Sequence, residues 1–204
     1  MSQSDEGTAN GAMSGAMSGA MSGAGSGAMS AAMRAAMAAS IRTVHDFPTP
    51  GIPFKDITPL LADPVYLAAA VQGMSAPFAA LGVTHVVAME SRGFIFGAPM
   101  ALHLGAAFVP ARKPGKLPWQ TIREAYALEY GENVLELHTD ALGAGARVLI
   151  VDDVLATGGT AAAAVALVRR LAGEVVGASF LIELPALAGR DRLPGIPTSS
   201  MLSY

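Results

Sequence analysis

The stretch VLIVDDVLATGGT, residues 148–160, decides the fold. Its first four residues are apolar, as in a strand buried inside a parallel sheet, and its last five open a helix. Gly158 and Gly159 would let backbone N–H groups approach an anion closely. Thr157 and Thr160 add hydroxyl donors at the positive end of the helix dipole. The stretch therefore predicts phosphate binding by Ala156, Thr157, Gly158, Gly159 and Thr160, which we call the phosphate loop.

Two acids stand beside the phosphate loop. Asp152 and Asp153 lie at the carboxyl end of the predicted strand. Their acceptor-only carboxylates suit the vicinal hydroxyls of a ribose, either directly or through a divalent cation. A sugar phosphate is therefore the ligand class that this stretch predicts.

Three other motifs do not fit the same stretch. A nucleoside-triphosphate P-loop requires a Lys before the last Thr, and a dinucleotide-binding fold requires Gly-x-Gly-x-x-Gly after its first strand. Response-regulator receiver domains also contain a VLIVDD-like strand, but most of such a domain follows that strand, whereas only about 50 residues follow it here.

Residues 41–204 alternate apolar runs with helical stretches and predict one α/β domain. Strands are expected at 83–89, 106–111, 147–152 and 175–183, with antiparallel strands at 124–130 and 133–138. Helices are expected at 31–43, 63–81, 92–105 and 160–171. Residues 112–121 hold too many Pro, Gly and Lys for regular structure and predict a long loop, which we call the basic loop.

Residues 1–40 differ in composition from the rest. From Gly11 they repeat GAMS-like tetrads, and 27 residues without charge separate Glu6 from Arg34. Their Gly and Ser content argues against a membrane span, and their acidic start argues against a secretory signal. Because glycine disfavours a helix, we expect a disordered extension, of which 31–40 could join the first helix.

The 204-residue chain has no cysteine, a net charge of −3 and only 14% charged residues. These values exclude a disulfide-built miniprotein, thiol metal sites and nucleic-acid binding by bulk electrostatics. Its four histidines have no metal-ligand spacing. Arg112, Lys113 and Lys116 nevertheless lie within five positions of an otherwise acidic domain, so the basic loop is expected to bind an anion.

The segment VDDVLATGGT (151–160) resembles the phosphoribosyl-pyrophosphate (PRPP) motif of the type I phosphoribosyltransferases. Three more segments resemble, in order, the adenine branch of that family: 46–64 (DFPTPGIPFKDITPLLADP), 90–102 (ESRGFIFGAPMAL) and 112–131. The likeness covers about residues 41–204, including ELPALAGRDRL near the end of the sequence.

This resemblance implies the type I phosphoribosyltransferase fold, a central, mainly parallel sheet flanked by helices with a flexible hood loop. It also implies the conversion of adenine and PRPP to AMP and pyrophosphate in purine salvage. Mg²⁺ would arrive with PRPP rather than occupy a dedicated metal site. We expect a cytoplasmic homodimer without nucleic-acid or membrane partners.

The resemblance also implies roles for single residues. Asp152 and Asp153 would hold the ribose hydroxyls, and the phosphate loop would hold the 5′-phosphate. Arg92 and the basic loop, as the family's hood, would hold pyrophosphate, and the peptide before Ser91 would be cis. Glu129 is the expected acid/base at the purine.

Adenine is expected at Ile52, Pro53, Phe54 and Lys55. Relatives read the base there with main-chain groups, but Pro53 has no N–H, so water or a neighbour would have to replace a donor at that position. Lys55 stands where many relatives carry Arg, which keeps the charge and loses the planar fork.

Two alternative functions stay open at this point. The first is a phosphoribosyltransferase that acts on a 6-oxopurine, hypoxanthine or xanthine. The second is a PRPP-binding regulator without catalysis, although the acidic, glycine-rich extension does not resemble the basic DNA-binding domain that such regulators carry.

Overall fold

Five strands form one parallel sheet in the computed structural model, in the order β4-β3-β7-β8-β9. The structure describes residues 29–127 and 132–204. The strands are β3 (His85–Met89), β4 (Ala107–Ala111), β7 (Arg147–Leu155), β8 (Glu174–Glu183) and β9 (Thr198–Ser203). The predicted α/β architecture is therefore confirmed.

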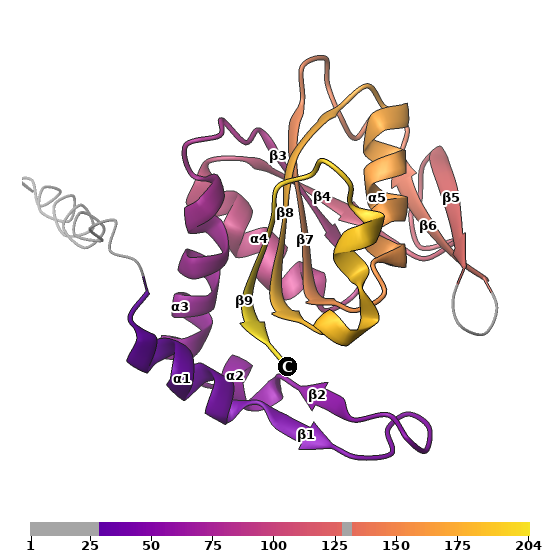
Figure 1. Cartoon of the computed structure of the whole chain (residues 1–204). Helices are drawn as coiled ribbons and strands as arrows, with labels where there is room; N and C mark the ends of the chain where they lie inside the picture. Colours follow the sequence, from indigo (N-terminus) through magenta and orange to yellow (C-terminus); the bar gives the residue numbers. More distant parts are fainter. Residues whose placement is uncertain (1–28, 128–131) are drawn as a thin grey trace, which may run out of the picture.

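Helices cover both faces of this sheet (Figure 1). The long ones are α3 (Pro64–Ser75), α4 (Gly93–Leu104) and α5 (Gly159–Arg170). Alternate residues of β3 enter two separate cores: Val86 packs with α3 and α4, and Val87 packs with α5. Burial on both faces explains why the sheet strands read as nearly continuous apolar runs.

Two antiparallel hairpins flank the sheet (Figure 1). One pairs β5 (Thr121–Ala127) with β6 (Glu132–His138), and its residues Leu135 and Leu137 pack in the core under α5. The other pairs β1 (Arg42–Val44) with β2 (Phe54–Asp56) at the far end of the molecule. The remaining elements are α1 (Ala31–Ser40), α2 (Thr58–Ala62) and the 3₁₀ turns η1 (Ala76–Phe78), η2 (Pro185–Leu187) and η3 (Gly189–Arg192).

Three predicted boundaries are wrong for identifiable reasons. The first helix ends at Ser40 rather than 43, because Arg42 pairs across the hairpin with Asp56. The α-helical part of the second ends at Ser75, where the Pro77-containing η1 turn follows. Strand β7 runs on to Leu155 rather than ending at 152, so Asp153 lies within the strand as well as Asp152.

Within the described residues, no helix combines the length and the apolar character that crossing a membrane would require.

Candidate active site

The phosphate loop lies between β7 and α5 and lines a hollow of about 290 Å³, part of it open to solvent. All five of its predicted residues line this hollow, together with Asp152 and Phe180. Helix α5 begins at Gly159, so the N–H groups of its first turn, which have no partner inside the helix, stand at the same place. The local structure is therefore suited to hold an anion.

Gly158 is required at the start of α5 on two grounds. Its φ of +77° lies in the left-handed region, which side chains rarely adopt. A Cβ at this position would also collide with the main-chain carbonyl oxygen of Gly189, in the η2–η3 segment. The loop backbone is thus packed directly on a second segment of backbone.

Asp152 and Asp153 lie side by side in β7. Asp153 is buried and Asp152 is partly exposed, and the N–H of Asp153 donates to Oδ1 of Asp152 (2.9 Å). Burial raises the pKa of both carboxyls, and the charge of Asp153 raises the pKa of Asp152 further. The pair therefore favours any cation that can approach it.

Arg92, at the start of α4, supplies one such cation. Its Nε lies 2.7 Å from Oδ2 of Asp153, and its charge opposes the burial effect on the pKa of that carboxyl. The contact is electrostatic rather than a directed hydrogen bond, because Oδ2 accepts none from the described residues. The peptide between Glu90 and Ser91, just before Arg92, is cis, as expected.

The β1–β2 hairpin brings part of the predicted adenine site to Arg92. The guanidinium carbon of Arg92 lies 5.1 Å from the centre of the Phe54 ring, and Phe47 packs edge-on against the same ring. Ile52 is half exposed, and its own N–H and C=O are bonded within the turn that also contains Pro53. Phe54 is therefore the member of this group that contacts Arg92, which in turn pairs with Asp153.

Lys55 follows Phe54 in β2 and takes part in a different set of contacts. Its Nζ lies 4.1 Å from the centre of the Tyr204 ring and donates to Oγ1 of Thr43. Since neighbouring strand residues point to opposite faces, these contacts turn Lys55 away from the side of β2 that meets Arg92.

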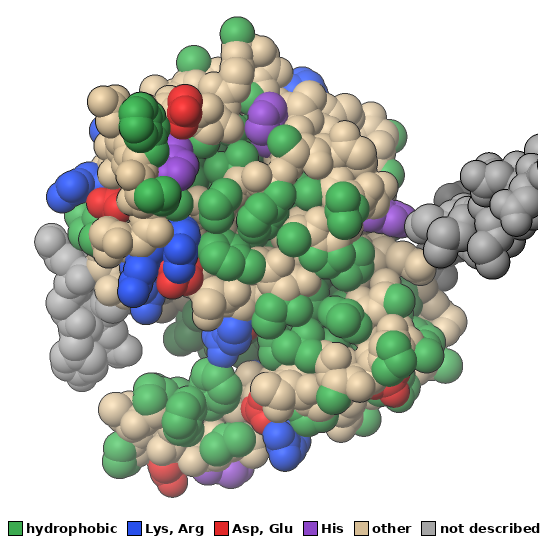
Figure 2. Space-filling view, turned by 180° about the vertical axis from the view of Figure 1, so that it is seen from behind, with side chains coloured by type: hydrophobic (Ala, Val, Ile, Leu, Met, Phe, Trp, Pro, Cys, Tyr) green, Lys and Arg blue, Asp and Glu red, His purple; other side chains and the backbone are tan. Residues whose placement is uncertain are grey.

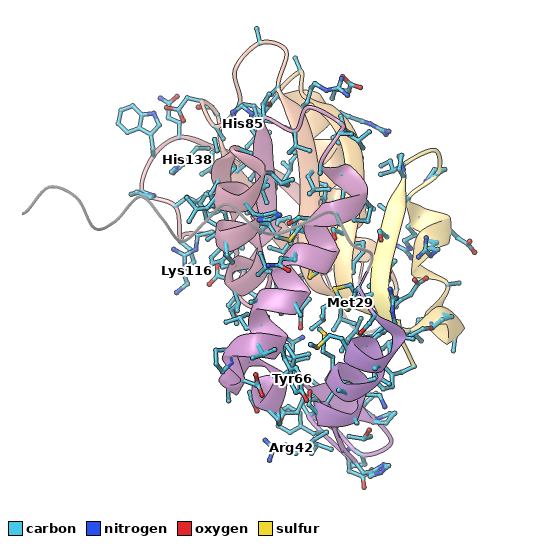
Figure 3. All side chains as sticks on the ribbon, turned by 90° about the vertical axis from the view of Figure 1, so that its left-hand side faces the viewer. Met29, Arg42, Tyr66, His85, Lys116 and His138 are labelled. Atoms are coloured by element: carbon cyan, nitrogen blue, oxygen red, sulfur yellow. The ribbon has the colours of Figure 1, made fainter. Side chains whose placement is uncertain are left out.

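Glu90, which follows β3, binds the first two basic residues of the basic loop. The Nε and Nη2 of Arg112 donate to the two oxygens of Glu90, and the main-chain N–H of Lys113 donates to Oε2. The Arg112 guanidinium holds the pKa of Glu90 below its usual range. Lys116 projects at the edge of the molecule, far from Arg42 of the β1–β2 hairpin (Figure 3). The structure thus joins Arg112 and Lys113 to the end of β3 and leaves Lys116 exposed.

Glu129, the predicted acid/base, lies outside the described residues, in the connection between β5 and β6.

Two groups at the site were missed as functional candidates. Glu90 comes directly after β3, at the carboxyl end of the strand, and ligands of parallel α/β sheets bind at that edge. This position in the sequence could have identified Glu90 as a candidate. Gly189, which contacts the backbone of the phosphate loop, lies about 30 residues after it, and no local pattern connects the two segments.

Comparison with known proteins places this site in a family. Residues 72–194 match the family model described as the phosphoribosyl transferase domain. The adenine phosphoribosyltransferase of Acidothermus cellulolyticus is 56% identical over 164 residues, which are 80% of this chain and 93% of the relative. That of Myxococcus xanthus is 55% identical over 166 residues, 81% of this chain and 90% of the relative.

Solved structures agree with the sequence comparison. The crystal structure of the Rhodothermus marinus adenine phosphoribosyltransferase is 53% identical, with a TM-score of 0.83, and covers 86% of this chain and all of its own. The Saccharomyces cerevisiae enzyme, crystallised with adenine and an imino-altritol bisphosphate, is 36% identical with a TM-score of 0.79, over 84% of this chain and 99% of its own. The resemblance in the sequence motifs is thus confirmed, and the chain belongs to the adenine phosphoribosyltransferase family.

Proposed function

We propose that the chain transfers the phosphoribosyl group of PRPP to adenine and releases AMP and pyrophosphate, as a step of purine salvage. The observation that carries this proposal is the hollow in which the phosphate loop and Asp152 meet, with Asp153 and Arg92 beside it. One end of this arrangement suits a 5′-phosphate, and the other suits ribose hydroxyls and a leaving anion. In the reaction, the bond from the anomeric carbon to pyrophosphate breaks, a bond to adenine nitrogen forms, and adenine loses a proton.

Each group of residues has a separate task in this step. The phosphate loop anchors the 5′-phosphate, which fixes the ribose relative to the base. Asp152 and Asp153 accept hydrogen bonds from the ribose hydroxyls, and their charge favours the oxocarbenium-like transition state. Arg92, Arg112, Lys113 and Lys116 hold the leaving pyrophosphate, and Arg92 must exchange part of its contact with Asp153 for it.

Mg²⁺ fits the same donor set. Carboxylate oxygens are ligands that Mg²⁺ takes in proteins, and Oδ2 of Asp153 accepts no hydrogen bond from the described residues. Asp152 and Asp153 would hold the ion together with PRPP, where its charge offsets that of pyrophosphate. Glu129 would serve as the acid/base at adenine. Ile52, Pro53 and Phe54 would surround the base, and Lys55 would contribute only its main chain, because its side chain is turned toward Tyr204 and Thr43.

The proposal includes a homodimer and a cytoplasmic location. The side of the molecule on which α4 lies carries a gathering of hydrophobic side chains (Figure 2), with Ile95, Leu102 and Phe108 among the exposed ones. An exposed apolar face of this kind is suited to pair with a second copy. Analytical ultracentrifugation tests the dimer, since a monomer at micromolar concentration contradicts it.

The proposed location is supported by composition, because a chain without cysteine is compatible with a reducing cytoplasm.

The deciding experiment incubates the protein with PRPP and Mg²⁺ and offers adenine, hypoxanthine and xanthine in separate reactions. We expect AMP from adenine and no nucleotide from the two 6-oxopurines. Turnover of hypoxanthine or xanthine instead would favour the 6-oxopurine alternative. Stoichiometric PRPP binding without turnover of any base would favour the regulator.

A further inference from the structure

The η2–η3 segment lies against the back of the phosphate loop. A Cβ on Gly189 would collide with the carbonyl oxygen of Ala156, and a Cβ on Gly158 would collide with the carbonyl oxygen of Gly189. Two backbone segments that touch without intervening side chains have little freedom to move separately. The position of the phosphate loop therefore depends on the position of Gly189.

Arg190, the next residue, fixes this segment to the sheet. Its Nε and Nη2 donate to the two carboxylate oxygens of Glu183 at the end of β8, both at 2.6 Å. Its Nη1 donates to the carbonyl oxygen of Thr198 in β9 (2.8 Å). The Arg190 guanidinium holds the pKa of Glu183 below its usual range. A planar fork with two parallel bonds and a third bond sets direction as well as distance.

Arg190 does not itself belong to the hollow. The residues that line it come from β7, the phosphate loop, α5 and Phe180 of β8. The side chain of Arg190 is instead engaged with Glu183 and β9, so any influence on a ligand must pass through Gly189.

We infer that Arg190 is a positioning residue for the 5′-phosphate: clamped between Glu183 and β9, it presses Gly189 against Ala156 and Gly158 and so holds the phosphate loop in its anion-binding shape. The inference rests on the proposed function, because it takes the phosphate loop to bind the 5′-phosphate of PRPP. It predicts that the Glu183–Arg190 pair affects the binding of PRPP and does not affect the binding of adenine.

The test compares Arg190→Gln with Arg147→Gln. Arg147 is a matched control: it also pairs with a glutamate, Glu174, and also donates to a main-chain carbonyl, but it lies at the opposite end of β7 from the phosphate loop. Both variants are measured for thermal unfolding, for the KM of PRPP and of adenine, and for calorimetric affinity toward ribose 5-phosphate.

In Arg190→Gln we expect the KM for PRPP and the Kd for ribose 5-phosphate to rise about tenfold, because small displacements of a binding loop cost that much or more. The KM for adenine should stay within about twofold, since the phosphate contacts are remote from the base. Arg147→Gln should lower the unfolding temperature without changing any of the three ligand constants. Arg190→Lys, which keeps the charge and loses the fork, should fall between wild type and Arg190→Gln.

Gly189→Ala gives an independent check, because its added Cβ displaces the phosphate loop while Arg190 stays in place. It should raise the KM for PRPP more than that for adenine. If Arg190→Gln does not fold, Arg190→Lys and Gly189→Ala decide the question. Wild-type PRPP and ribose 5-phosphate constants in folded Arg190 variants, or an equal rise in both KM values, overturn the inference. Failure of the wild-type chain to make AMP would instead overturn the proposed function.

Discussion

At the scale of single residues, the site depends on a balance of charge in β7. Asp152 and Asp153 are adjacent carboxyls whose pKa values are raised by burial, and Arg92 is the cation nearest to Asp153. Ionised acids in this position are costly until a cation approaches them. The free protein is therefore prepared for a ligand that brings positive charge along with its hydroxyl groups.

Asp153→Asn tests this balance. Asparagine keeps the size of the side chain and removes a charge whose burial is unfavourable, so the unfolding temperature should equal or exceed that of wild type. The value of kcat/KM for PRPP should fall about 100-fold or more, because the charge that we propose stabilises the reacting sugar is lost. Steady-state kinetics and thermal unfolding measure the two effects. Asp140→Asn, at an exposed aspartate, is the control, and wild-type turnover in Asp153→Asn would contradict the assignment.

The pH dependence follows from the same shifts. Between the ordinary aspartate pKa of about 3.9 and the raised values, the folded chain binds more protons than the unfolded chain. The free energy of unfolding of the free protein should therefore fall as pH rises through this window. If PRPP binds to the ionised carboxyls, as proposed, its binding should strengthen over the same window.

Arg92→Gln should shift the acidic limb of the kcat/KM profile for PRPP to higher pH. The reason is that Arg92 lowers the pKa of Asp153, so its loss removes the main cause that opposes the effect of burial on this pKa. Arg169→Gln, at an exposed arginine of α5, should leave the limb unchanged. A limb that stays in place in Arg92→Gln, or moves to lower pH, would show that Arg92 does not control this carboxyl.

At the scale of elements, Glu90 joins the basic loop to the end of β3. It accepts two hydrogen bonds from Arg112 and one from the N–H of Lys113. Glu90→Gln keeps the shape and weakens these charge-assisted bonds. If the basic loop closes over PRPP and excludes water, weaker anchoring of this loop should admit water to PRPP. The hydrolysis of PRPP in the absence of adenine, measured as released pyrophosphate, should then rise about fivefold. A coupled pyrophosphate assay measures it.

The control for this change is Glu124→Gln, which disturbs an ion pair between Glu124 of β5 and Arg170 of α5. Equal rates of pyrophosphate release in wild type and Glu90→Gln would separate Glu90 from the closure of the basic loop.

The elements that could be predicted are those whose signal is local. The strand–loop–helix around residues 148–160 carries its apolar run, its glycines and its threonines in one stretch, and the structure has that arrangement. Strand β9 was missed because its sequence, TSSMLS, has neither an apolar run nor alternation, and only its pairing with β8 makes it a strand. The contact of Gly158 with Gly189 was missed for the same reason, since nothing local connects the two positions.

At the scale of the whole molecule, α1 connects β9, the edge strand of the sheet, with the hydrophobic core on the α3 face of the sheet. Met37 is fully buried. Nη1 of Arg34 donates to the carbonyl oxygen of Met201, and the hydroxyl of Tyr204 donates to the carbonyl oxygen of Ala38. These contacts place residues 31–40 within the packed domain. We therefore propose a domain that begins near Ser30, where the side chain caps α1.

Two truncations test this boundary. Removal of residues 1–28 should leave both KM values and the unfolding temperature unchanged. Removal of residues 1–40 takes away buried Met37, whose loss alone costs about 2–5 kcal/mol, and should lower the unfolding temperature clearly. Differential scanning calorimetry of the two proteins separates these outcomes. Equal stability of both would return the boundary to residue 41.

The parallel order of the sheet has a consequence for synthesis of the chain. Strand β9 comes last in sequence and covers the edge of β8, and its Thr198 also receives a hydrogen bond from Arg190. Domains form on the ribosome only as their parts emerge. A chain released before residues 198–203 are made, as at a premature stop, would therefore leave the β8 edge uncovered and give an aggregation-prone template in the cell.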